Sequence, residues 1–211
     1  MKRVFIIAFL LLFYSLIVNQ KIRSAFAENI DLNLSDDEIG VIFISKNDST
    51  YLYIKNKEYN NVVLLDDNYK DIEKTVKLFG AKRIDNLISK NDVKGSYTNR
   101  YDFNNTNLNN IKIKEEDNII DIKIYDYHLC IYNSGVNNNI NACTFTYFKS
   151  ANEDININDS NKVVIFNENE EEKFQEKIYT KWIDTYTLDN DNYTVIKIKK
   201  DNYNIINIPS N

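Results

Sequence analysis

Imidazole and thiol side chains, which serve both metal binding and nucleophilic catalysis, are scarce in this chain, which has one histidine and two cysteines among 211 residues. His128 and Cys130 lie close together on one predicted strand, so the imidazole is held too rigidly beside the thiol to act as its base. A catalytic zinc ion needs three protein ligands and an open position for water. One imidazole and two thiols that can pair with each other do not make such a set.

The two cysteines, Cys130 and Cys143, have two alternative fates. The segments 124–132 and 142–148 are rich in β-forming residues, and a stretch rich in asparagine and glycine joins them. If the chain folds there as a hairpin, the cysteines face each other within disulfide distance. The hairpin therefore predicts a disulfide, whereas the alternative leaves two buried free thiols.

The sequence also lacks the complete motifs of calcium-binding, phosphate-binding and serine-nucleophile sites. Segments that start at Asp31, Asp154 and Asp189 begin like an EF-hand calcium loop, but each lacks the glycine at position 6 and the glutamate at position 12. The four glycines of the chain form no phosphate-binding loop, and no Gly-x-Ser-x-Gly turn presents a serine. We therefore expect no cofactor and a non-enzymatic role, with a carboxylate-based enzyme as a distant alternative.

The first residues have the pattern of an export signal. A basic start is followed by an uncharged apolar run over residues 4–18 and by an Ala-x-Ala pattern that ends at Ala27. This predicts a signal peptide over 1–27 and a single globular domain over 28–211. The alternative is an uncleaved anchor, although the run is shorter than the roughly 20 residues that span a bilayer. Either way, the domain is expected to be secreted or extracytoplasmic.

Composition limits the partners of this domain. Hydrophobic residues make up 43% and charged residues 27%, as in ordinary globular proteins, and the net charge is −5. A negative chain has no basic field that would attract nucleic acid or an anionic membrane surface. We expect an unidentified extracellular partner, with membrane contact only through residues 4–18 if they remain attached.

Hydrophobic periodicity predicts strands and two helices. A helix over 69–79 is expected to be capped by one of the residues 66–68 and to end at Gly80. A second amphipathic helix is expected over 173–182, with Trp182 in the core, and residues 89–110 are expected to form a loop. The predicted strands are 41–45, 50–55, 61–66, 84–89, 110–114, 119–132, 143–148, 163–166, 185–188, 193–199 and 205–208. The strand–helix–strand unit indicates an α+β fold in which mixed β-sheets are flanked by helices.

Three short motifs carry a resemblance to a known family: Leu64-Leu65-Asp66, Leu78-Phe79-Gly80 and Ile84-Asp85-Asn86-Leu87-Ile88. With the closing segment 185–205, they resemble the metallo-β-lactamase superfamily, in particular its secreted competence-type branch, which is related to DNA uptake. The resemblance implies a truncated sandwich of two sheets between helices, with Asp66 and Gly80 at structural positions of the family.

The metal-binding loop of that family is degenerate here. Where the family has a Thr-His-x-His-x-Asp-His arrangement, this chain has Ser89, Lys90, Asn91, Asp92, Val93 and Lys94 in sequence. Of these, only Asp92 is a possible ligand, and the two lysines would repel a cation. The resemblance therefore implies a hydrolase-like scaffold that has lost its metal.

Two functions follow from these observations. The first is a secreted or cell-surface domain on the degenerate scaffold, with a binding or structural role. The alternative is an unrelated β-rich extracellular module that binds a glycan or a protein, for which alternating tyrosines such as Tyr51 and Tyr53 would supply a face. The same tyrosines also fit plain sheet packing.

Overall fold

The computed structural model describes most of the chain after residue 28. The described residues are 29–46, 49–66, 71–104, 106–116, 119–132, 143–150, 157, 161–172, 178, 183–189 and 192–209. The predicted export segment lies outside them, as does Trp182 with most of the helix expected around it. Within the described part of the chain, no helix is long and apolar enough to cross a membrane.

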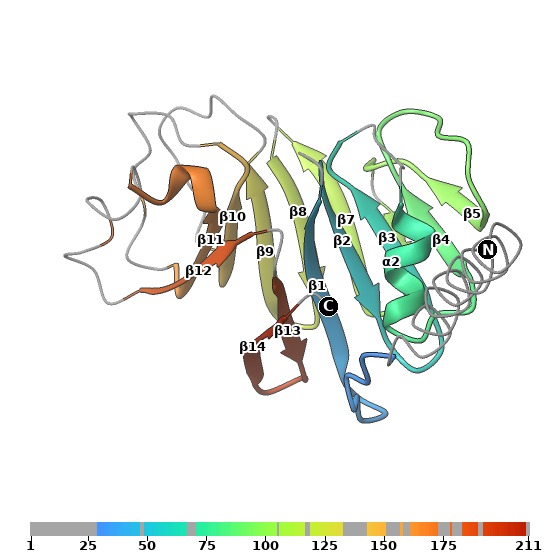
Figure 1. The fold of residues 1–211 in the computed structure, drawn as a ribbon, viewed down its shortest axis with the longest axis horizontal. Coiled ribbons are helices and arrows are strands. Elements are labelled where there is room, and N and C mark those ends of the chain that lie inside the picture. Colours follow the sequence, from blue (N-terminus) through green and yellow to red (C-terminus); the bar gives the residue numbers. More distant parts are fainter. Residues whose placement is uncertain are drawn as a thin grey trace, which may run out of the picture.

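The first sheet has seven strands in the order β14-β13-β1-β2-β3-β4-β5 (Figure 1). The C-terminal hairpin returns to pair with β1, while β3, β4 and β5 run parallel to one another. The strands are β1 (Ile39–Lys46), β2 (Ser49–Lys55), β3 (Asn60–Leu64), β4 (Ile84–Ile88), β5 (Tyr97–Tyr101), β13 (Asn192–Ile198) and β14 (Tyr203–Pro209).

The second sheet also has seven strands, in the order β12-β11-β10-β9-β8-β7-β6. Its β6 to β9 form an antiparallel meander, and its β9 to β12 are parallel. A 3-10 turn, η1 (Glu168–Glu170), follows β11. The strands are β6 (Thr106–Leu108), β7 (Ile111–Glu116), β8 (Ile119–Ile124), β9 (Tyr127–Tyr132), β10 (Phe145–Phe148), β11 (Val163–Asn167) and β12 (Asp184–Leu188).

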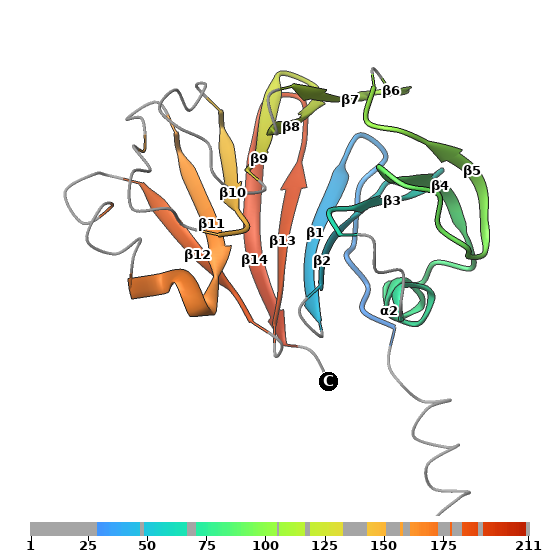
Figure 2. The ribbon, with the colours of Figure 1, turned by 90° about the horizontal axis from the view of Figure 1, so that it is seen from above.

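The two sheets pack face to face around one apolar core (Figure 2). Successive side chains of a strand point to opposite faces, so Val41 and Phe43 enter this core while Ile42 and Ile44 face the other way. The outward residues of the first sheet are covered by helix α2 (Ile72–Leu78) and by Leu32 from the leading segment. Because both faces of β1 are covered, its sequence is a continuous apolar run rather than an alternating one.

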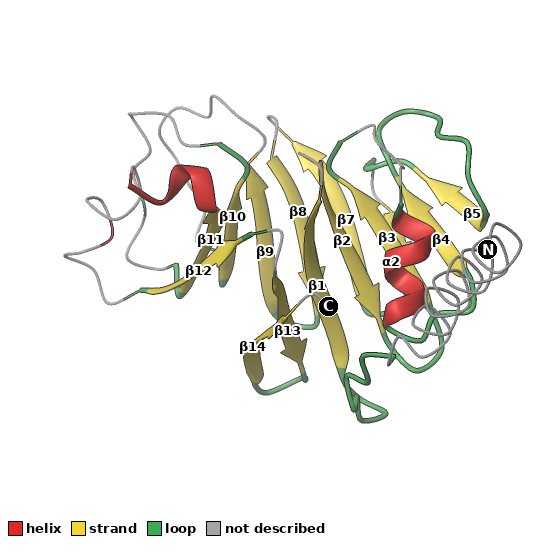
Figure 3. Cartoon of the chain, in the orientation of Figure 1, coloured by secondary structure: helices red, strands yellow, loops and turns green. Residues whose placement is uncertain are grey.

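The expected α+β sandwich flanked by helices is wrong, because the molecule is mostly β (Figure 3). Among the described residues, α2 is the only α-helix whose two ends are defined. The expected loop over 89–110 contains strands β5 and β6 instead. Strand β5 lies at the edge of the first sheet with exposed polar side chains, so its sequence lacks the hydrophobic alternation that reveals a strand.

The predicted strand–helix–strand unit is present, since β3 and β4 pair in parallel with α2 between them. Gly80 follows the C-cap residue Phe79 at φ 76°, the left-handed conformation expected at this position. The predicted cap by residues 66–68 is wrong. The N-cap is Asp71, which makes no side-chain capping bond, and Asp66 has other partners.

Replacing Gly80 by alanine is expected to lower the free energy of unfolding by about 1 kcal/mol. An added Cβ would meet only Lys55 Nζ, at 3.7 Å, so the cost comes from the backbone conformation and not from crowding. Urea unfolding measures this loss, with Lys74→Ala, at an exposed position of the same helix, as the control. If the two variants were equally stable, the left-handed backbone at Gly80 would carry no cost for alanine.

Candidate binding sites at opposite ends of strand β1

A polar site lies beside the end of β1, where several parallel strands finish. Lys149 follows β10, Asn167 ends β11 and Asp189 follows β12. Because these strands are parallel, their carboxyl ends meet at one edge of the second sheet. With Ser45 of β1 and Thr50 of β2, they line a pocket of about 290 Å³, which we call the strand-end site.

Asp66 has both carboxylate oxygens engaged beside this pocket. Its Oδ2 accepts a hydrogen bond from the Thr50 backbone N–H at 3.0 Å, and its Oδ1 pairs with the Lys149 ammonium. The side chains of Asp66 and Lys149 are 20% and 31% exposed, so the pair is partly shielded from solvent. A metal ion at Asp66 would have to displace a charged amine.

Tyr147 ties the two sheets together at the same place. Its hydroxyl donates to Asn167 Oδ1 at 3.0 Å and lies 3.2 Å from Thr50 Oγ1, across the sheet interface. Asn167 in turn donates to the Lys149 carbonyl at 3.1 Å. Burial raises the pKa of Tyr147 to about 12. The strand-end site is thus held by a closed network of hydrogen bonds.

The segment that the resemblance aligns with a metal-binding loop, residues 89–94, follows β4. Ser89 is buried, and its hydroxyl donates to the Asn91 carbonyl at 2.8 Å and accepts from Arg100 Nε at 3.2 Å. Asp92 is exposed and lies 3.8 Å from Arg100 Nε. Of the two lysines, Lys90 pairs with Glu115 at 3.3 Å, and Lys94 is exposed. A guanidinium therefore occupies the centre of this loop.

The other chemistry-bearing residues lie apart from the strand-end site. His128 Nδ1 lies 3.1 Å from Asp121 Oδ1 on the neighbouring strand β8, at the outer face of the second sheet. Within the described ranges, no three side chains of His, Cys, Asp or Glu gather as metal ligands would. Asp66, Asp92 and His128 therefore do not form a ligand set.

Cys130 and Cys143 form a disulfide with a Cα–Cα distance of 6.0 Å. The hairpin expected to bring them together is wrong, because β9 and β10 pair in parallel. Cys130 lies on β9, Cys143 precedes β10, and the bridge belongs to the apolar cluster on the outer face of the second sheet. The bridge thus joins β9 to the start of a parallel neighbouring strand rather than linking the two arms of a hairpin.

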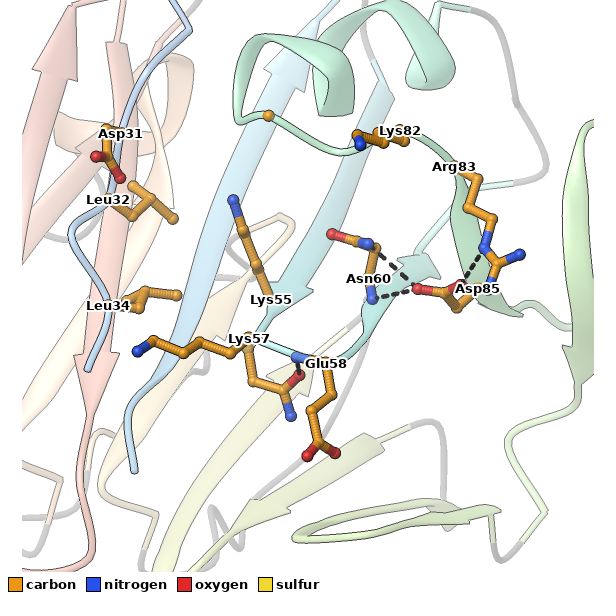
Figure 4. A pocket seen from close by; sticks show the side chains of 12 residues that line it. Asp31, Leu32, Leu34, Lys55, Lys57, Glu58, Asn60, Lys82, Arg83 and Asp85 are labelled. Atoms are coloured by element: carbon orange, nitrogen blue, oxygen red, sulfur yellow. Dashed lines mark hydrogen bonds and ion pairs between the residues drawn. The ribbon is translucent and has the colours of Figure 1, made fainter. Parts of the chain in front are cut away.

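A pocket of about 650 Å³ lies on the outer side of the first sheet near the C-terminal end of α2 (Figure 4). Asp85 accepts hydrogen bonds from the Asn60 backbone and side chain at 2.9 and 3.2 Å, and from Arg83 Nε at 2.7 Å. Lys55 Nζ donates to the Phe79 carbonyl at 2.5 Å, and burial lowers the pKa of this lysine. These charged groups fasten β2, β3, β4 and the helix end to one another.

A second polar pocket lies between the two sheets, at the opposite end of β1 from the strand-end site. It measures about 240 Å³ and is lined by asparagines, two tyrosines and three aliphatic side chains; we call it the amide slot. Asparagine is so abundant in this chain that these positions do not stand out in the sequence. The pattern that could have predicted the slot is one asparagine on each of three successive parallel strands. The asparagines are Asn56, Asn61, Asn86, Asn99, Asn107, Asn109 and Asn110.

No protein-family model, no curated protein and no solved structure matches this chain.

Proposed function

We propose that the domain is a non-catalytic binding domain that works outside the cytoplasm. One observation carries this proposal: Asp66, the acid beside the strand-end site, is engaged by the Lys149 ammonium and the Thr50 N–H. Hydrolytic metal sites need unprotonated ligands that are free to bind the cation. An internal ammonium supplies the positive charge that a metal would bring, without an open position for water.

The resemblance to the metallo-hydrolases suggests how the Asp66–Lys149 ion pair arose, namely by replacement of a metal site in an ancestral enzyme. Beside the loop after β4, which the resemblance aligns with the family's metal-binding loop, Arg100 of β5 contacts Ser89 and lies 3.8 Å from Asp92. Two cationic side chains at this edge favour a scaffold whose metal function has been replaced by internal ion pairing. The Cys130–Cys143 disulfide supports the location, since such bridges persist in oxidising compartments outside the cytoplasm.

Metal analysis of the purified full-length protein tests the proposal. We expect substoichiometric zinc by elemental analysis and no hydrolysis of phosphodiester or β-lactam substrates, with or without added zinc. Activity would require a metal held by several ligands and a water molecule whose pKa that metal lowers, and no three His, Cys, Asp or Glu side chains of the described residues gather as such ligands. Stoichiometric zinc together with turnover would refute the proposed function.

The Lys149–Asp66 ion pair is expected to stabilise the folded protein. Replacing Lys149 by methionine is expected to lower the free energy of unfolding by about 1–2 kcal/mol, because it leaves a partly buried carboxylate without its cation. A double-mutant cycle with Asp66→Asn, measured by urea unfolding, should give a coupling energy of about 1 kcal/mol or more.

The pair Lys90–Glu115, in which the acid is 20% exposed like Asp66 but the lysine is largely exposed, supplies the control. The Lys90 side chain is 66% exposed, so the cycle of Lys90→Met with Glu115→Gln should give a coupling energy below about 0.5 kcal/mol. If both cycles gave equally small coupling energies, Asp66 and Lys149 would not form a stabilising ion pair. The main support for the proposal would then be lost.

The alternative, a β-rich extracellular module that binds a glycan or a protein, has an observation of its own. The fold is built almost entirely of strands, and the amide slot opens between its two sheets. Neither candidate is an enzyme. They differ in whether the domain descends from a metallo-hydrolase or from an unrelated β-rich protein. The chemistry of the slot therefore bears on what such a domain would bind.

A further inference from the structure

The amide slot contains a ladder of three asparagine side chains. Asn61, Asn86 and Asn99 are register neighbours on the parallel strands β3, β4 and β5. Asn86 Nδ2 donates to Asn61 Oδ1 at 2.7 Å, and Asn99 Nδ2 donates to Asn86 Oδ1 at 3.1 Å. The ladder satisfies the central amide on both sides, which is what burial of a polar group requires.

A ladder of this kind leaves one group at each end without a partner. The Asn61 side-chain nitrogen has no hydrogen-bond acceptor among the described residues, although Asn61 is only 3% exposed and lines the slot. If all three amides were turned over, the free group would be the Asn61 oxygen instead. In both arrangements, one amide group of Asn61 lines the slot without a hydrogen-bond partner among the described residues, so a ligand in the slot can bond it.

The rest of the lining is neutral. Seven asparagines and two tyrosines line the slot, and none of its lining residues is charged in a chain that is 27% charged. An amide offers a donor and an acceptor side by side, which matches a pair of neighbouring hydroxyl groups on a ligand. A charged ligand would find no counter-charge in these walls, so a neutral polar ligand is favoured.

An aromatic ring stands among these amides. Tyr59 is the one large hydrophobic side chain among the described residues that is clearly exposed, at 39%. Its turn is fixed by Asn56, whose Oδ1 accepts hydrogen bonds from the backbone N–H groups of Glu58 and Tyr59 at 2.9 and 2.6 Å. A tyrosine ring offers an apolar face and a polar tip, which suits the C–H face and the hydroxyls of a sugar ring.

We propose that the amide slot binds one neutral sugar residue, with the Asn61 and Asn99 amides bonding its hydroxyls and the Tyr59 ring covering its apolar face. The slot volume of about 240 Å³ is below the roughly 300–1,000 Å³ of pockets for drug-sized ligands, which fits a single sugar residue. This inference gives the proposed binding role a ligand class. It rests on that role only in assuming that the domain binds rather than cleaves.

The test uses the full-length protein and four neutral probes: the methyl glycosides of glucose, galactose, mannose and N-acetylglucosamine. Saturation-transfer NMR and calorimetry should show at least one of them binding with a dissociation constant in the millimolar range, and inorganic phosphate should not compete. Tyr59→Ala and Asn99→Ala change exposed positions and should each weaken that binding about tenfold. Asn204→Ala, an exposed asparagine on β14, is the matched control and should bind as the unaltered protein does.

Failure of all four glycosides to bind at millimolar concentrations would overturn the inference. Binding that Tyr59→Ala leaves unchanged would also overturn it, because the sugar would then lie elsewhere. Neither outcome affects the metal measurement, which tests the proposed function separately. Conversely, stoichiometric zinc with turnover would remove the non-catalytic role without changing the sugar titration of Tyr59→Ala.

Discussion

Replacing both Cys130 and Cys143 by alanine is expected to lower the free energy of unfolding by about 3 kcal/mol. The bridge joins residues separated by 13 positions, and a cross-link of that span restricts the unfolded chain by about this amount. Alanine is chosen because both positions are buried in an apolar cluster, where a serine hydroxyl would add its own cost. Urea unfolding under oxidising conditions gives the difference directly.

Reductant supplies the control for this variant. Dithiothreitol should destabilise the unaltered protein by a similar amount and should leave Cys130→Ala/Cys143→Ala unchanged, because that variant has no bridge to break. If reductant does not affect the unaltered protein, the bridge contributes nothing to its stability. The support that the disulfide lends to an extracytoplasmic location would then disappear as well.

The predictable parts of the fold are those whose signals are local. Gly80 was found because a left-handed residue after a helix favours glycine, and its φ of 76° confirms it. The strand–helix–strand unit was found because α2 lies between two continuous apolar runs, as parallel strands with both faces covered require. In each case a few neighbouring residues determine the outcome.

The missed parts depend on partners far away in the sequence. Asp66 was one of three residues expected to cap α2, but its partner Lys149 lies 83 positions away, and no local sequence signal predicts that pair. Segments 124–132 and 142–148 were expected to form a hairpin because they are close in sequence and rich in β-formers. The parallel pairing of β9 and β10 is decided by the whole second sheet.

The candidate sites were missed for a compositional reason. Asn61, Asn86 and Asn99 acquire meaning only when β3, β4 and β5 are in register, because the ladder requires the three amides to lie side by side. In a chain so rich in asparagine, their positions carry no distinguishing signal. Residues 89–94 follow β4, as the predicted strand over 84–89 implies, but the contact of Ser89 with Arg100 could not be foreseen, since β5 was not recognised as a strand.

The buried tyrosines predict a steep loss of stability in alkaline solution. Burial raises the pKa of Tyr147 to about 12, and it also raises the pKa values of Tyr51 and Tyr53 above that of a free tyrosine, near 10. A group whose pKa is raised in the folded state gives stability that is complete below the unfolded pKa. That stability is lost as the pH rises through the folded pKa, so the loss should begin near pH 10 and continue toward pH 12.

Tyr147→Phe isolates one of these groups. At neutral pH the variant should be about 1 kcal/mol less stable, because it loses the hydrogen bond to Asn167. Near pH 11 the free energy of unfolding should fall less steeply with pH for the variant than for the unaltered protein. The two slopes should differ by about 1.4 kcal/mol per pH unit, because the variant lacks one ionising group. The two curves should therefore approach each other as the pH rises from 10 and cross near pH 11.

Thr50→Val is the control that separates the hydrogen bond from the titration. It removes the hydroxyl that lies 3.2 Å from Tyr147 but keeps the tyrosine, so its curve should lie lower at every pH with the slope of the unaltered protein. Urea unfolding between pH 7 and pH 11, with tyrosine ionisation followed by ultraviolet absorbance, measures all three proteins. Parallel curves for Tyr147→Phe and the unaltered protein would mean that Tyr147 ionises without cost. The closed network that ties Thr50, Tyr147 and Asn167 across the two sheets would then not exclude water.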